Sequence, residues 1–292
     1  MVHRRDVILG LTLLAVLLGL IFITFLLLKT VAMEGIPIKK ACVGVVEING
    51  PIINPMPVVE RLERYIQDDN ILAVVLRLNT PGGGVSATQE ICETVKKTRQ
   101  SGKSVIASMG AVAASGGYYI AAVCDTIVAT PGTITGSIGV IAEFAEFSDL
   151  LEKIGIGINV RKSGKYKDIG SISREMTKEE EALIDGVIMD IYEQFVQEVS
   201  EGRNLDSDFV REYADGRIFT GKQALEIGFV DMLGTYQDAI DLAGNIAGLG
   251  INPPVYKETR NVFWEVFSGG VSKIMARLFE LEIPRISYMW VN

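Results

Sequence analysis

The stretch ILAVVLRLNTPGGG, residues 71–84, runs from β-branched and apolar residues directly into a turn of three glycines. Such an apolar run is typical of a strand that is buried on both faces of a sheet. In the segment that follows, residues 87–99, Ile91 and Val95 lie four residues apart among charged residues, which predicts a surface helix. A strand, a glycine turn and a helix in this order predict an α/β fold.

Further strands and helices are predicted on both sides of this unit. Residues 43–48 (VGVVEI) and 104–109 (SVIASM) are largely apolar runs that indicate two more buried strands. Residues 221–230 predict a short helix that leads into a turn, and residues 236–246 predict another helix. Strands that alternate with helices agree with the α/β class.

The clearest helix is predicted to begin at Thr177, because Thr177 and Glu180 form a capping-box pattern. Gly202 near its end suits a C-cap. Its apolar positions follow one stripe at the helical period: Leu183, Ile184, Val187, Ile188, Ile191, Phe195 and Val199.

Composition excludes several classes of function. The formal charge of −8 and the pI near 4.9 argue against a nucleic-acid surface, since phosphate contacts need clustered Lys and Arg. Cys42, Cys92 and Cys124 lie far apart without C-x-x-C spacing, so buried free thiols are expected rather than a zinc site. The single histidine, His3, precedes an apolar segment, so no Ser/His/Asp or His-metal arrangement is expected in the folded part.

An N-terminal membrane anchor is predicted over residues 7–28, which are 22 residues without a charged side chain. A cleaved signal peptide is the alternative, because Thr30-Val31-Ala32 loosely resembles a cleavage site, although its apolar region is normally only about 7 to 15 residues. Arg4 and Arg5 favour a cytoplasmic N-terminus, which places the remaining chain outside the cytoplasm. We therefore expect an anchor over 1–30, a linker over 31–40, a catalytic domain over 41–250 and a tail over 251–292.

Two predicted turns contain candidate catalytic residues. Glycines at 82–84 allow backbone N–H groups to approach a ligand, which suits an oxyanion but is equally typical of a plain structural turn. Ser115, in AASGG (113–117), lies where a tight turn enters an apolar helix, a place where serine is also a common N-cap. One N–H from the Gly82/Gly83 region and one from Gly116 would together form a two-donor oxyanion hole over Ser115.

A serine nucleophile needs a base, and without histidine the candidates are Lys, Asp or Glu. Lys162, Lys165 and Lys167 crowd one segment, with Asp168 directly after the last lysine. For a lysine to act as a base, its pKa must fall by about 3 pH units, which corresponds to about 4 kcal/mol, and burial against apolar walls can supply this. Each of these lysines taken alone is typical of a solvated surface charge.

Together the motifs resemble the signal peptide peptidase A family of serine peptidases, in its short form with one copy of the fold. The resemblance runs from about residue 43 to residue 234. It rests on five segments in order: NTPGGG (79–84), AASGGYY (113–119), TGSIGV (135–140), GKYK (164–167) and DGRIFTG (215–221).

The resemblance implies a repeated ββα spiral fold, like that of Clp peptidases and crotonases, preceded by one transmembrane helix. It implies that Ser115 is the nucleophile and that Lys167, rather than Lys162 or Lys165, is the general base. The oxyanion donors that it implies fall on Gly82, Gly83 and Gly116, and the wall of the substrate groove on Thr135, Gly136, Ser137 and Ile138.

The resemblance also implies a role and partners. The expected substrates are signal peptides that remain in the membrane and other membrane-associated peptides, cleaved without a metal or organic cofactor. In short members of the family the lysine is similar to one delivered from a neighbouring subunit, so a ring-like homo-oligomer is expected. The expected location is the cell membrane, with a single span and an extracytoplasmic catalytic domain.

Other functions remain open from the sequence. A Ser/Lys membrane protease directed at a specific protein partner, a non-catalytic ring-forming scaffold and a crotonase-like acyl-CoA enzyme are the alternatives. In the tail, Phe263, Trp264, Phe267, Leu278 and Trp290 suit a subunit contact, a membrane contact or the end of the core.

Overall fold

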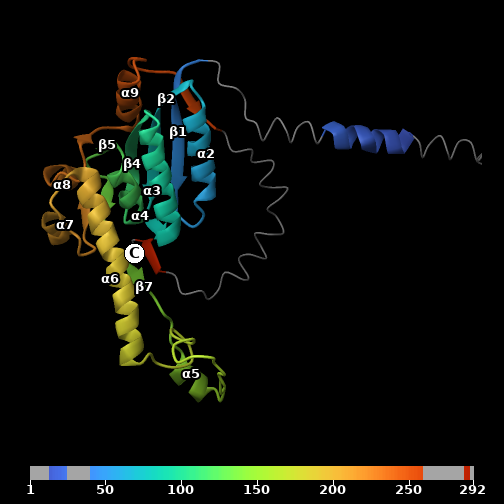
Figure 1. The fold of residues 1–292 in the computed structure, drawn as a ribbon, viewed down its shortest axis with the longest axis vertical. Helices are drawn as coiled ribbons and strands as arrows, with labels where there is room; N and C mark the ends of the chain where they lie inside the picture. The colour runs from blue at the N-terminus through green and yellow to red at the C-terminus, as the bar shows by residue number, and fades with distance from the viewer. Residues whose placement is uncertain (1–12, 25–39, 259–285, 290–292) are drawn as a thin grey trace, which may run out of the picture. The chain divides into compact units, whose positions relative to one another are not determined.

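The computed structural model describes residues 13–24, 40–258 and 286–289, and the chain divides into two compact units, Met1–Lys40 and Ala41–Asn292. In the first unit residues 13–24 form a helix, while the two ends of the predicted span over 7–28 lie outside the described residues. Among the helices described, none combines the length and the apolar character needed to cross a membrane. The second unit contains the core (Figure 1).

A mostly parallel sheet forms the centre of the second unit. β1, β2, β4 and β5 are hydrogen-bonded in this order, with β10 outside β1 and β9 outside β5. The register pairs Val45 with Val75 and Val75 with Ile106. These strands span Cys42–Asn49 (β1), Ile71–Thr80 (β2), Ser104–Ala114 (β4), Thr126–Ala129 (β5), Met232–Leu233 (β9) and Val255–Lys257 (β10).

Helices cover both faces of this sheet, which explains why its strands are apolar without a break. On one face Val75 and Ile106 pack against Ala239 and Ile240 of α9 (Tyr236–Ile246). α2 (Met56–Gln67), α3 (Val85–Gln100) and α4 (Gly116–Ala122) lie together in Figure 1 and pack on β1, β2 and β4. The mixed α/β architecture expected from the sequence is confirmed.

Two further strands extend the first sheet from β4, and three short strands form a second sheet. β6 (Ile134–Gly136) continues parallel to β4, and β8 (Ile218–Thr220) runs antiparallel to β6. In the second sheet, β11 (Ile286–Met289) lies antiparallel between β3 (Gly82–Gly84) and β7 (Ile141–Ala142). Part of the predicted tail therefore pairs with this chain's own glycine turn, while residues 259–285 and 290–292 lie outside the described residues.

The long helix α6 spans Lys178–Arg203, with the predicted capping box between Thr177 and Glu180. The prediction that Gly202 caps it is wrong, because the C-cap is Asn204 in a left-handed conformation. A Cβ at Gly202 would overlap the carbonyl oxygen of Ala122, so this glycine lets α6 pack against the end of α4. Phe195 and Val199 of the predicted stripe are buried, whereas Leu183 and Val187 are exposed.

Three short helices complete the fold. α7 (Ser207–Tyr213) and α8 (Gly221–Glu226) follow α6 at the C-terminal end of that helix, where they pack near β8. α5 (Ser148–Lys153) lies beyond β7, near the N-terminal end of α6 (Figure 1). The segment that joins α5 to α6, residues 154–177, contains all three candidate lysines.

Candidate active site

Ser115 occupies the turn between β4 and α4, in a backbone conformation that is rare for a residue with a side chain. Its φ is 53° and its ψ is −119°. Its N–H donates to the carbonyl of Gly136 over 2.8 Å, and its carbonyl accepts from the N–H of Tyr119 over 2.9 Å. Because both sides of the turn are tied in this way, the surrounding structure imposes the strained conformation, which is a common feature of functional residues.

The glycine turn lies beside a neighbouring backbone so closely that a side chain does not fit. The N–H of Gly84 donates to the carbonyl of Ile52 over 2.8 Å, and the N–H of Ile52 donates to the carbonyl of Gly82 over 2.8 Å. A Cβ at Gly83 would overlap the backbone of Ile52. Since neighbouring residues of a strand point their polar groups to opposite edges, the N–H of Gly83 faces the other edge, where β11 lies.

The structure brings the serine turn and the glycine turn together. A Cβ on Gly116 would lie 3.3 Å from both the Cα of Gly82 and the N of Gly83. The N–H of Gly82 already donates to Thr80 Oγ1 over 3.1 Å, and the N–H of Gly83 faces β11. Gly116 and, where a substrate takes the place of β11, Gly83 are therefore the better candidates for oxyanion donors. The three glycines predicted from the sequence are thus neighbours of Ser115.

Thr88 was not predicted, and it fills the space behind these turns. Its side chain is fully buried, and its Oγ1 lies 2.7 Å from the position of a Cβ on Gly116. Within the part of the chain that the structure describes, this hydroxyl has no hydrogen-bond partner. No pattern in the sequence distinguishes Thr88, because it is one of several polar residues in the predicted surface helix.

Ser115 opens into a cavity of about 460 Å³. Of the predicted wall residues, Ser137 lines this cavity, while Thr135 and Ile138 are fully buried behind it and Gly136 holds the N–H of Ser115. The lining comes from four parts of the chain: Ser115; Ser137, Gly139, Val140 and Ile141; Ile188, Met189 and Tyr192 of α6; and Ala214, Asp215 and Gly216.

The contribution of α6 to the cavity was not predicted. Ile188 belongs to the predicted apolar stripe, for which the sequence analysis predicts a helix and no binding role. Asp215 was singled out within its motif but received no role, and its carboxylate forms two hydrogen bonds of 2.7 Å with Arg217. The mainly apolar lining suits apolar side chains of a ligand.

Lys167 does not line this cavity. It is exposed, and its N–H donates to the carbonyl of Gly164 over 3.2 Å. Its side chain makes no hydrogen bond or ion pair to any residue in the described ranges. Lys162 and Lys165 instead pair with Asp168 and Glu179. Within one chain, therefore, Ser115, the glycines and Ser137 lie together, and Lys167 lies apart from them.

The cysteines behave as buried thiols, as expected. Cys42, Cys92 and Cys124 are free and buried, and burial raises the pKa of Cys124 to about 12. Cys92, Glu93 and Glu198 are close enough to hold a metal ion. However, the ammonium of Lys96 already donates to Glu93 and Glu198, each over 2.9 Å, so both carboxylates already have a cationic partner in the protein.

Comparison with known proteins agrees with this geometry. Residues 97–250 match the model of peptidase family S49. A putative protease of Synechocystis is 46% identical over 205 residues, which cover 70% of this chain and 74% of that protein. A putative signal peptide peptidase SppA of Enterococcus faecium is 41% identical, with 62% of this chain and 53% of that protein covered.

Longer relatives are matched over a smaller part of their length. Protease 4 of Haemophilus influenzae is 34% identical over 69% of this chain, but only 34% of that protein is covered. The matched family segment contains Ser115, the whole of α6 and Asp215. On the family match and on the relatives together, this chain belongs to peptidase family S49.

Proposed function

We propose that this chain is a membrane-anchored serine peptidase in which Ser115 is the nucleophile and Lys167 is the general base. The observation that carries the proposal is the place of Ser115. It lies in a strained turn at a largely apolar cavity, with the backbones of Gly83 and Gly116 beside it. Membership of family S49 supports a serine peptidase.

Peptides are the substrates that the geometry favours. β11 lies between β3 and β7 as an extended segment, so the two strand edges next to Ser115 can pair with a peptide backbone. A relative named as a signal peptide peptidase supports substrates of that kind. The proposed substrates are remnant signal peptides and other membrane-associated peptides.

The proposed reaction has two acyl-transfer steps. Lys167 Nζ takes the proton of Ser115 Oγ, which attacks the peptide carbonyl, and the N–H groups of Gly83 and Gly116 hold the oxyanion. The lysine then gives its proton to the leaving amine. Water, deprotonated by the same lysine, attacks the ester and releases Ser115.

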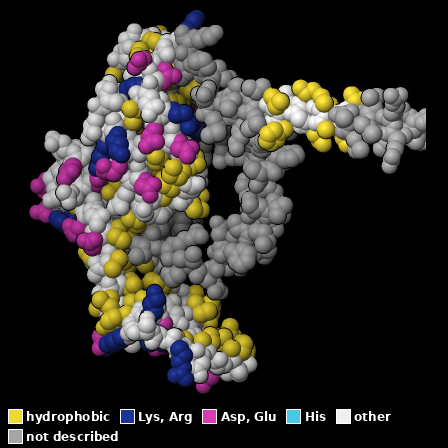
Figure 2. Space-filling model, turned by 45° about the vertical axis from the view of Figure 1, so that its right-hand side comes forward, with side chains coloured by type: hydrophobic (Ala, Val, Ile, Leu, Met, Phe, Trp, Pro, Cys, Tyr) yellow, Lys and Arg dark blue, Asp and Glu magenta, His cyan; other side chains and the backbone are white. Residues whose placement is uncertain are grey.

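A second chain is part of the proposal. In one chain Lys167 is exposed and absent from the lining of the Ser115 cavity, so a neighbouring subunit must provide the contact between them. Figure 2 shows hydrophobic side chains gathered at the lower end of the molecule, where α5 and the first half of α6 lie. We therefore propose a ring-like homo-oligomer with shared sites.

The proposed anchor comprises residues 7–28, which are uncharged and of which 13–24 form a helix. With the N-terminus in the cytoplasm, the catalytic domain lies outside the cytoplasm at the membrane surface, close to the proposed substrates. The proposed fold type is the ββα spiral of Clp peptidases and crotonases, and the mixed sheet with helices on both faces supports this proposal.

The test uses the full chain in detergent and a fluorogenic apolar peptide. Ser115→Ala and Lys167→Ala should each lose about a thousandfold or more in kcat. A mixture of the two variants should regain activity, because some sites then combine an intact serine with an intact lysine. Activity in Ser115→Ala would refute the proposal. Activity in Lys167→Ala together with its loss in Lys165→Ala would move the base to Lys165.

A further inference from the structure

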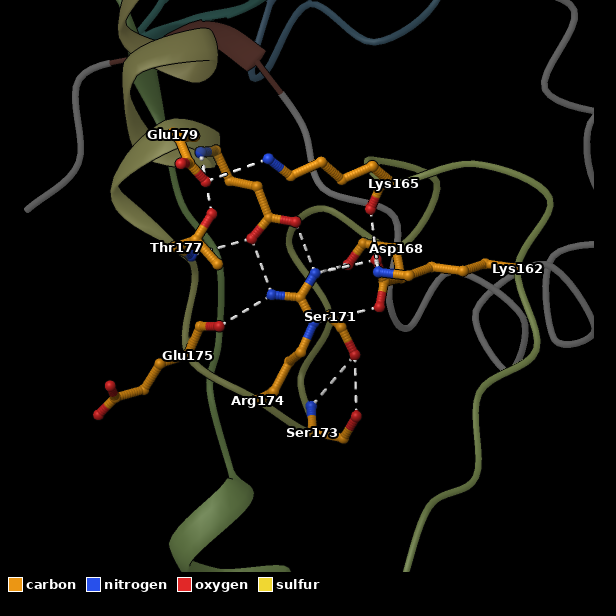
Figure 3. A network of polar contacts seen from close by, with 10 residues as sticks. Lys162, Lys165, Asp168, Ser171, Ser173, Arg174, Glu175, Thr177 and Glu179 are labelled. Atoms are coloured by element: carbon orange, nitrogen blue, oxygen red, sulfur yellow. Dashed lines mark hydrogen bonds and ion pairs between the residues drawn. The ribbon is translucent and has the colours of Figure 1, made fainter.

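A charged cluster fastens the lysine segment to the first turn of α6 (Figure 3). The guanidinium of Arg174 donates to both carboxylate oxygens of Glu180, over 2.6 and 2.7 Å. The same guanidinium donates to both carboxylate oxygens of Asp168, from Nε over 3.1 Å and from Nη2 over 2.9 Å. We call Asp168, Arg174 and Glu180 the Arg174 clamp. A planar fork that engages two carboxylates fixes their relative positions.

The backbone on both sides of Lys167 is fixed by side-chain hydrogen bonds. On one side Lys162 Nζ donates to the carbonyl of Lys165 over 2.9 Å and to Asp168 Oδ1 over 2.6 Å. On the other side Asp168, the next residue, is held by Arg174. The side chain of Asp168 is 13% exposed, whereas Lys167 is exposed. The clamp thus fixes the backbone of Lys167 and leaves its ammonium group available for a contact elsewhere.

The other side of the clamp leads to the Ser115 cavity. Glu180, whose side chain is 3% exposed, also accepts from the N–H of Thr177 over 2.9 Å and so forms part of the cap of α6. Ile188 lies eight residues further along the same helix and lines the cavity. At about 1.5 Å per residue, the clamp lies about 12 Å from that turn. One rigid helix therefore connects the lysine segment to the cavity wall.

Asp168, whose carboxylate is the closest in sequence to Lys167, is already bound by other side chains. Arg174 and Lys162 both bind Asp168 and hold its pKa well below its usual range. Arg174 likewise lowers the pKa of Glu180 to about 2, so both carboxylates are ionised at neutral pH. A carboxylate without these partners would attract the nearest ammonium and favour its protonated form. The clamp therefore keeps Asp168 from forming an ion pair with the ammonium of Lys167.

We propose that Arg174 and Asp168 are positioning residues for Lys167, an inference that rests on the proposed role of Lys167 as the general base. Arg174 holds the lysine segment at a fixed place on α6 and keeps Asp168 from pairing with Lys167. Neither residue lines the cavity, so they act on the rate of the chemical steps and not on peptide binding.

The experiment compares Arg174→Gln with Glu179→Gln in the full chain. Glu179 is on the same turn of α6 and pairs with Lys165 over 3.3 Å, but this pair is exposed and outside the clamp. Arg174→Gln should lower kcat by about tenfold to a hundredfold, with KM within about twofold of wild type. Glu179→Gln should leave both constants unchanged. A kcat for Arg174→Gln equal to that of Glu179→Gln would overturn the proposal.

The pH profile separates positioning from a loss of stability. The charged groups around the segment are Lys162, Lys165, Asp168, Arg174, Glu179 and Glu180. In Arg174→Gln, Asp168 keeps Lys162 as a partner but loses Arg174, and its less occupied carboxylate should move the acid limb of kcat to higher pH. Asp168→Asn should lower kcat without that movement, because no carboxylate is left. Equal movement of the limb in both variants would overturn the role of Asp168.

Mixing experiments assign the defect to one half of the site. Arg174→Gln mixed with Ser115→Ala should regain activity, because the second variant supplies an intact lysine segment. Arg174→Gln mixed with Lys167→Ala should not rise above the low activity of Arg174→Gln alone, since both lysine segments are defective. An active Lys167→Ala would overturn both this inference and the proposed function. An inactive Lys167→Ala with a fully active Arg174→Gln would overturn the clamp alone.

Discussion

The backbone at Ser115 holds a conformation that a side chain disfavours, and this allows a prediction of stability. A φ of 53° with a ψ of −119° costs a residue with a Cβ about 1 to 3 kcal/mol. Ser115→Gly relieves this strain but loses about 0.5 to 1 kcal/mol through the greater freedom of the unfolded chain. We expect Ser115→Gly to unfold about 3 °C above Ser115→Ala in a thermal melt, although both are inactive.

The comparison with Ser115→Ala is the control, since both variants lack the hydroxyl and only glycine removes the Cβ. Equal melting temperatures of Ser115→Gly and Ser115→Ala would contradict the proposed backbone strain at residue 115. Melting of Ser115→Gly below Ser115→Ala would show that the Cβ contributes packing at this turn, where the residue is 1% exposed.

Some residues of the candidate site could be predicted from the sequence, and others could not. Ser115 and the glycines could be predicted, because tight turns with glycine leave a local pattern in the sequence. Thr88 could not, since its importance comes from the approach of Gly116, which lies far away in the chain. Gly202 suggested a cap because it stands near a helix end, whereas its function depends on a contact with Ala122 that only the packed structure reveals.

At the scale of elements, β11 occupies the strand edges to which a peptide substrate would bind. It pairs with Gly82–Gly84 on one side and with Ile141–Ala142 on the other. Being part of the same chain, it competes with substrate at a high effective concentration. Deletion of residues 286–292 should therefore lower KM for a peptide by about threefold to tenfold and leave kcat unchanged.

Deletion of residues 290–292 alone is the matched control for this prediction, because it leaves β11 intact. That shorter chain should keep the wild-type KM. An unchanged or higher KM after removal of residues 286–292 would show that β11 does not compete with the substrate. A fall in kcat would show that it supports the site.

The elements themselves were largely predictable. The strands predicted from apolar runs agree with β1, β2 and β4, and the predicted helices agree with α3, α6 and α9. β3, β7 and β11 have two to four residues each and no periodicity of their own, so their pairing arises only in the folded chain. The α6 stripe was predicted correctly as a helix, but its exposed half could not be distinguished from its buried half by period alone.

At the scale of the molecule, one end of the chain exposes apolar side chains. Leu183 and Val187 of α6 are 46% and 45% exposed, and the segment after α5 adds Ile154 and Ile156 at 58% and 52%. Surfaces of this kind mark interfaces in proteins that assemble. Together with the position of Lys167 outside the Ser115 cavity, they place the proposed subunit contact at this end of the chain.

We therefore expect Leu183→Asp/Val187→Asp to dissociate the proposed oligomer and lower activity by at least about tenfold, because each aspartate would bury an unpaired charge in the subunit contact. Residues 41–292, one compact unit with its own core, suit the measurement of mass by light scattering. Ile246→Asp is the control, since this isoleucine is 49% exposed but lies on α9. A wild-type fragment that is both monomeric and active would refute the shared site. A Leu183→Asp/Val187→Asp variant that stays assembled would move the interface elsewhere.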